Sequence, residues 1–110
     1  MPSKRPLQRL HEIIEDIDLI AEYTAGMPEE KFSEDRKTVH ATERCLMVIS
    51  EAAIKLGPEA ESLVPDMPWH NIRGLGNVLR HAYDQVSTQL LWEIITVDLP
   101  PLKKAIEKHL

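Results

Sequence analysis

The stretch VHATERCLMVISEAAIKL, residues 39–56, decides the fold. Its apolar side chains recur at alternating intervals of three and four residues, which places them along one face of an α-helix. That face comprises Val39, Thr42, Leu46, Ile49, Ala53 and Leu56. The polar member, Thr42, can bury its methyl group while its hydroxyl donates to a backbone carbonyl one turn back. A seam of this length is typical of a helix in a bundle.

An amphipathic helix is predicted before this stretch as well. From Leu7 to Ile20 the apolar residues follow the same spacing, and the opposite face is acidic. Gly26 and Pro28 are expected to end this helix, because neither residue continues a helix easily. A short helical turn is predicted over residues 28–32.

The later part of the chain also reads as helical. Ser33 is the predicted N-cap of the helix that contains residues 39–56, and Gly57 with the following proline is expected to end it. Residues 58–68 hold three prolines and read as a connector with one helical turn. A further helix is predicted from Trp69 to Tyr83, and Ser87 is a candidate N-cap for the next.

The C-terminal segment is predicted to be interrupted by prolines. The run Leu99-Pro100-Pro101 is expected to break or kink its helix, and Leu102, Ile106 and Leu110 would then form the apolar side of a last helical piece. No segment shows the period-two alternation of a β-strand. The prediction is an all-α fold, an antiparallel bundle of four to five helices forming one domain over residues 1–110.

Composition narrows the classes of function. The 110 residues carry a net charge of −5, which argues against a broad basic surface for DNA. The longest apolar runs are far shorter than a membrane span, and we expect a cytoplasmic protein without membrane attachment. The single cysteine, Cys45, flanks the apolar seam and reads as a buried, unreactive thiol. We expect no metal site and no cofactor.

Residues 69–84, WHNIRGLGNVLRHAYD, carry the candidate chemistry. On a helix, one side of this segment is apolar and the roughly opposite side is polar. The apolar side comprises Ile72, Leu75, Leu79 and Ala82, and the polar side comprises Arg73, Asn77, Arg80 and His81.

The same segment is anomalous in charge and in glycine content. Residues 69–83 contain no acid and carry a net charge of +2, so the other residues total −7 against −5 for the whole chain. Gly74 and Gly76 each cost about 1 kcal/mol relative to alanine inside a helix. A close approach by another backbone or by a ligand would explain glycines there.

The polar side chains suit acid–base chemistry on a phosphodiester. Histidine moves a proton near neutral pH, and arginine holds a phosphate and stabilises its developing charge. RNA carries its own nucleophile, the 2′-hydroxyl, so such a site could cleave it without a metal ion. The alternative is that this face is ordinary solvated surface.

The segment resembles the signature of HepT-like proteins of the HEPN superfamily, small helical bacterial toxins paired with a minimal nucleotidyltransferase antitoxin. The resemblance rests on the order Trp69, Ile72, Gly74-Leu75, Asn77, Leu79, His81 and Tyr83. It extends over most of the chain through Asp16-Ile17, Tyr23, Phe32, Ile49, Glu51-Ala52, Pro65, Pro68-Trp69, Trp92 and Leu99-Pro100.

The resemblance implies a metal-independent endoribonuclease toxin that acts as a homodimer, with the motif helices of two copies meeting in one composite site for RNA. It implies that His81 is the acid–base residue and that Asn77 positions RNA or supports the helix. It further implies that Tyr83 accepts AMP from the antitoxin nucleotidyltransferase, which silences the toxin. Apart from the resemblance, Glu51 lies off the apolar seam and is expected to pair with Arg44, Arg73 or Arg80 across the interface.

One position departs from the family pattern. Where the family has arginine, five residues before His81, this chain has Gly76. Arg73 and Arg80 are seven residues apart, so they lie nearly on one line of the helix, and either could supply the guanidinium. Two readings stay open: a ribonuclease that uses Arg73 or Arg80, and a catalytically weakened module that serves as a nucleotidyltransferase partner, an AMP acceptor or a nucleotide-binding scaffold.

Overall fold

The computed structural model describes residues 5–81 and 87–110, and within these ranges every regular element is helical. The all-α prediction is confirmed. The helices are α1 (Pro6–Tyr23), α2 (Glu29–Glu34), α3 (Arg36–Leu56), α4 (Glu59–Leu63), α5 (Trp69–His81), α6 (Thr88–Glu93), the π-helical turn η1 (Ile94–Asp98) and α7 (Leu99–Glu107).

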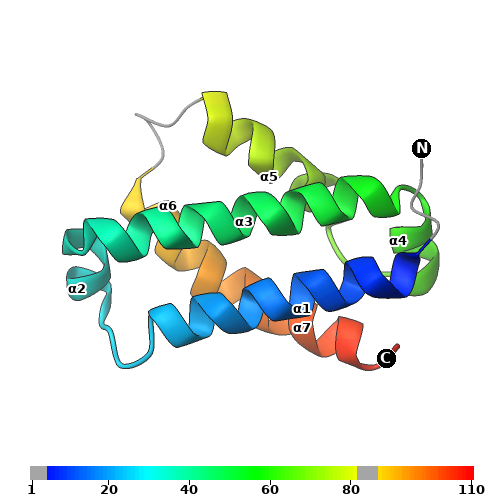
Figure 1. The fold of residues 1–110 in the computed structure, drawn as a ribbon, viewed down its shortest axis with the longest axis horizontal. Coiled ribbons are helices and arrows are strands. Elements are labelled where there is room, and N and C mark those ends of the chain that lie inside the picture. The colour runs from blue at the N-terminus through cyan, green and yellow to red at the C-terminus, as the bar shows by residue number, and fades with distance from the viewer. Residues whose placement is uncertain (1–4, 82–86) are drawn as a thin grey trace.

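The two longest helices, α1 and α3, form the centre of the fold. They run antiparallel and side by side, and the α6–η1–α7 segment lies behind them in Figure 1. The predicted seam of α3 is confirmed, since all six of its residues are buried. Its partners on α1 are Leu10, Ile13, Ile17 and Ile20, also buried. Burial of such apolar side chains is the main favourable term in folding.

Two tryptophans tie the short elements to this core. Trp69, at the start of α5, is 1% exposed, and its indole Nε1 donates to the carbonyl of Val64 at 2.8 Å. Trp92 of α6 is half-buried against Phe32 of α2, with ring centroids 5.2 Å apart. Each contact anchors a helix of modest length to the body of the protein, as large aromatics commonly do.

The helix ends are partly as predicted. Ser87 caps α6, since its Oγ accepts from the Leu90 amide at 3.1 Å, and α3 ends at Leu56 before Gly57, which has a φ of 59°. The N-cap of α3 was wrongly placed at Ser33. Asp35 takes that role by accepting from the Thr38 amide, and Ser33 donates to a carbonyl inside α2.

Three other predictions need correction. Thr42 is fully buried, and no described residue hydrogen-bonds its hydroxyl, so the expected bond to a carbonyl one turn back does not form. Of the break or kink expected at Leu99-Pro100-Pro101, the break does not occur, because the wider η1 turn precedes the prolines and places them in the first turn of α7. Leu110, predicted to line the last helical piece, lies beyond α7 and is 49% exposed.

No described helix is long and apolar enough to cross a membrane.

Candidate functional site

The motif helix α5 lies along α3 with its outer side uncovered by the other described helices (Figure 1). Leu79 is buried, and Ile72 and Leu75 are half-buried, as the apolar face predicted. Gly76 is buried as well, so the face of α5 that packs on α3 extends further toward the arginine side of the helix than predicted. Arg80 therefore lies at the edge of the contact between α5 and α3.

The closest approach of α5 to α3 is a contact between Gly76 and Ser50. The Ser50 hydroxyl accepts from the Gly76 amide at 2.9 Å and donates to the Arg73 carbonyl at 2.9 Å. A Cβ atom at position 76 would lie 3.0 Å from the Ser50 Oγ. The close approach expected from the sequence is found at this glycine. At Gly74 a Cβ would meet nothing within 4 Å, and nothing in the structure explains that glycine.

Arg73 is directed toward the end of α3 and toward α4. Its Nη1 donates to a Glu61 carboxylate oxygen at 3.0 Å, and its Nη2 donates to the second Glu61 oxygen and, at 2.9 Å, to the Gly57 carbonyl. The hydrogen bond from the guanidinium lowers the pKa of Glu61. Arg73 thus fastens the start of α5 to the α3–α4 junction within the same chain.

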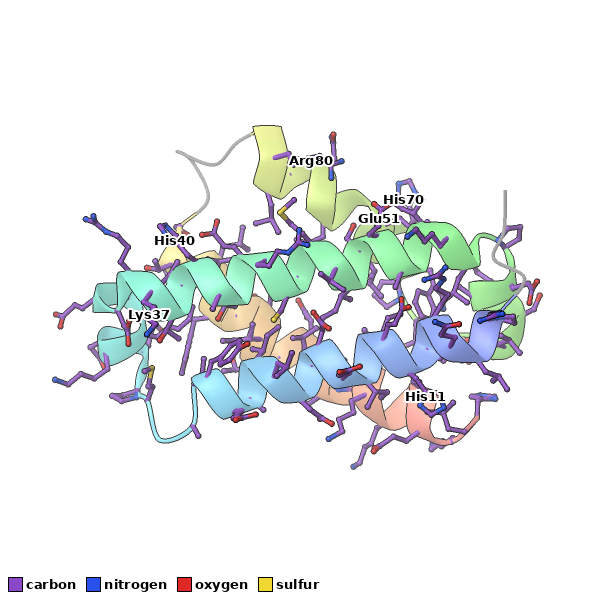
Figure 2. The ribbon with its side chains drawn as sticks, in the orientation of Figure 1. His11, Lys37, His40, Glu51, His70 and Arg80 are labelled. Atoms are coloured by element: carbon purple, nitrogen blue, oxygen red, sulfur yellow. The ribbon has the colours of Figure 1, made fainter. Side chains whose placement is uncertain are left out.

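Arg80, one turn beyond Gly76, is exposed and directed elsewhere. Its Nη1 lies 3.5 Å from the position that a Cβ of residue 76 would occupy. The side chain borders a polar pocket of about 350 Å³ between α1, α3 and α5. The other residues around the pocket are Glu12, Arg44, Met47, Val48, Glu51, Ala52 and Lys55. Figure 2 shows Arg80 on α5 and Glu51 on α3, the helix beside it.

The remaining predicted site residues are only partly described. Asn77 is exposed on the outer side of α5. His81 is the last residue of α5, four residues after Asn77 and therefore about one helical turn away, and its side chain is not described. Tyr83 lies outside the described residues. Of the two arginines predicted to flank Asn77, only Arg80 has a guanidinium that no described carboxylate engages.

Sequence reasoning missed two members of this pocket as site residues. Arg44 and Lys55 are eleven residues apart, which on a helix brings them to within about 20° of one another. This spacing is the sequence signal that places both cations on one side of α3. Glu51 lies in the same pocket but forms no ion pair with Arg44, Arg73 or Arg80 in the described part of the chain.

The single thiol takes no part in this site. Cys45 is 4% exposed, and burial, together with the nearby Asp16 carboxylate, raises its pKa to about 11. The predicted burial is confirmed, and a raised pKa favours the protonated thiol, the less reactive form. Among the described residues no three of His, Cys, Asp and Glu cluster in a way that could hold a metal ion.

The chain belongs to the ribonuclease HepT-like family, whose model matches residues 13–109. This confirms the resemblance drawn from residues 69–84. A Thermococcus cleftensis protein named "Probable ribonuclease HepT" is 36% identical over 99 residues, covering 90% of each chain. A Methanocaldococcus jannaschii protein named "Putative RNase" is 31% identical over 106 residues, covering 96% of this chain and 97% of its own. No solved structure matches the chain.

The two glycines of α5 should respond oppositely to alanine. We expect Gly74→Ala to raise the free energy of unfolding by up to about 1 kcal/mol, because alanine is the better helix former and the site is open. Gly76→Ala should give no such gain and should lower stability, because its methyl group would press on Ser50. Urea unfolding followed by circular dichroism measures both. Equal gains from the two substitutions would contradict the close-approach explanation.

Proposed function

We propose that the chain is a metal-independent endoribonuclease, the toxin of a toxin–antitoxin pair whose antitoxin is a minimal nucleotidyltransferase, acting in the cytoplasm. The observation that carries the proposal is the exposed Arg80 on the same helix as Asn77 and His81, beside a pocket with two more cations. Membership of the HepT-like family and the names of the relatives support RNA as the substrate.

In the proposed reaction, the ribose 2′-oxygen attacks the neighbouring phosphorus and the bond from phosphorus to the 5′-oxygen breaks. The proton of the 2′-hydroxyl is removed and a proton is delivered to the departing 5′-oxygen, leaving a 2′,3′-cyclic phosphate and a free 5′-hydroxyl. The His81 imidazole supplies this acid–base function because it exchanges protons near neutral pH. Asn77 positions the RNA or supports the helix beside it.

We assign the phosphate-binding role to Arg80 and not to Arg73. The Arg73 guanidinium is bound by the Glu61 carboxylate and the Gly57 carbonyl, so using it would break an existing ion pair. Arg80 is exposed, and its guanidinium lies over the position where a side chain at residue 76 would start. A guanidinium there can hold a phosphate and stabilise charge in the transition state.

Cleavage assays on three variants test these assignments. His81→Ala should abolish cleavage of a labelled RNA, and Arg80→Ala should slow it by about 10²–10³-fold, the usual loss of one transition-state donor. Arg73→Ala should act mainly by lowering thermal stability, since it removes the contact to Glu61. Excess EDTA in every assay checks metal independence. Cleavage by His81→Ala at the wild-type rate would refute the proposal.

We further propose that two copies pair through the outer side of α5, so that both motif helices contribute to one site. That side is uncovered by the other described helices, and Val78 at its centre is 46% exposed. An exposed branched side chain next to polar site residues is suited to the middle of an interface.

Dimer formation is open to direct measurement. Light scattering at micromolar concentration should give twice the chain mass of 12.6 kDa. Val78→Asp should yield the monomer and lose cleavage, because it would place two carboxylates against each other in the interface. Leu110→Asp, at an exposed apolar residue beyond the end of α7, is the control and should leave the dimer intact. A wild-type monomer at that concentration would remove the composite site.

One observation favours the second candidate function, a catalytically weakened module modified at Tyr83. Position 76 is backed by Ser50 and holds glycine where the family has arginine. Such a module would bind the nucleotidyltransferase, accept AMP or hold a nucleotide without cleaving RNA.

Intact-mass analysis separates this candidate from the first. After co-expression with a minimal nucleotidyltransferase of the proposed antitoxin class, the protein should gain the mass of one or more AMP units, and Tyr83→Phe should not. An unmodified protein recovered from a complex with an active nucleotidyltransferase would show that Tyr83 is not the acceptor.

A further inference from the structure

The polar pocket holds more positive charge than the proposed chemistry needs. Arg44 and Lys55 on α3 and Arg80 on α5 all border it. Arg44 and Lys55 are about 16 Å apart along the axis of α3, because eleven residues rise by 1.5 Å each. One guanidinium is enough for the phosphate that is cleaved, so Arg44 and Lys55 are unused by that reaction.

None of these three cations forms an ion pair within the described residues, although the chain has 18 acidic residues against 13 basic ones. Elsewhere in the described part of the chain, Arg73 binds Glu61 and Lys103 binds Asp18. A group of unpaired cations in an acidic protein is a place where an external anion gains most from binding.

The acids around the pocket do not cancel this charge. Glu12 is already engaged, because its two carboxylate oxygens accept from the Arg9 guanidinium at 2.9 and 3.1 Å. Asp16 lies close enough to Arg44 to interact with it. Glu51 is the one carboxylate left inside the pocket, and it sits between Arg44 and Lys55 in the α3 sequence. The lining therefore carries three cations against two carboxylates, Glu51 and the Arg9-bound Glu12, which leaves an excess of one positive charge.

Apolar side chains also line the pocket. Met47 and Val48 are half-buried and Ala52 is buried, so the charged groups lie beside apolar surface. Charge above apolar walls acts more strongly on an anion than charge in open water does.

We infer that Arg44, Lys55 and Arg80 form a surface that binds the backbone phosphates of the RNA substrate. The cleaved phosphate would lie at Arg80, and other phosphates of the strand would lie along α3. This inference rests on the proposed ribonuclease function. A length of about 16 Å is enough to contact several nucleotides of a single strand. Contacts to phosphates position the strand and carry no base preference.

Binding to a labelled single-stranded RNA of about 12 nucleotides, followed by fluorescence anisotropy, tests the inference. The measurements use the His81→Ala protein, so that cleavage does not interfere. Arg44→Gln and Lys55→Gln should each weaken binding by about 3–10-fold at low salt. Each should also reduce the slope of log affinity against log salt by about 0.7, the value for one phosphate contact on a single strand.

Two further variants make the test specific. Lys37→Gln removes one positive charge from the same helix but from the end far from the pocket (Figure 2), and it should leave the slope unchanged. Glu51→Gln removes the negative charge inside the pocket and should strengthen binding. Circular dichroism of each variant confirms that the helices are retained.

The outcomes separate the inference from the function on which it rests. Wild-type cleavage of RNA, together with Arg44→Gln and Lys55→Gln binding like Lys37→Gln, would overturn the inference alone. RNA binding that depends on Arg44 and Lys55, without cleavage by the wild type, would support the surface and refute the catalytic proposal. If the protein binds poly-glutamate through Arg44 and Lys55 but does not bind RNA, the surface recognises an acidic protein, and the inference is overturned.

Discussion

The contact between Ser50 and Gly76 governs the placement of everything proposed for the site. One buried hydroxyl both accepts from and donates to the backbone of α5, and the absence of a side chain at residue 76 leaves room for this close contact. The contact sets the distance between α3 and α5 and fixes which residues of α5 lie at their junction. Arg73 is consequently within reach of the α3–α4 junction and Arg80 within reach of the α3 pocket. Ser50 therefore acts on the site through the helix that carries it, without belonging to the reacting groups.

The long-range core of the fold could be predicted because it depends on periodicity. The α3 seam occupies one helical face whatever the rest of the chain does, and its six residues are all buried. The local errors came from competition between similar signals. Ser33 and Asp35 are both good N-cap residues two positions apart, and Asp35 takes the role while Ser33 bonds inside α2. The prolines after Leu99 were expected to interrupt the helix, but a π-helical turn accommodates them.

The site was harder to predict than the fold because the contacts of long side chains depend on the tertiary structure around them. A helical wheel places Arg73 and Arg80 on nearly one line, yet their guanidinium groups lie in different surroundings. The partners that separate them, Gly57 and Glu61 for Arg73, belong to segments whose position follows only from packing. The charge anomaly in residues 69–83 indicated the helix on which we propose the chemistry. It could not reveal that α3 adds two cations to the same surface.

The manner in which α5 is held has a consequence for its dynamics. The helix rests chiefly on one neighbour, so undocking it exposes Trp69, Leu79 and a few half-buried side chains, while the core between α1 and α3 stays intact. Segments with few buried contacts open at a lower free energy than the whole domain. The backbone amides of α5 should then exchange with solvent hydrogen through their own opening, ahead of those in the middle of α3. A protein that captures this opened state could switch the site off without unfolding the rest of the bundle.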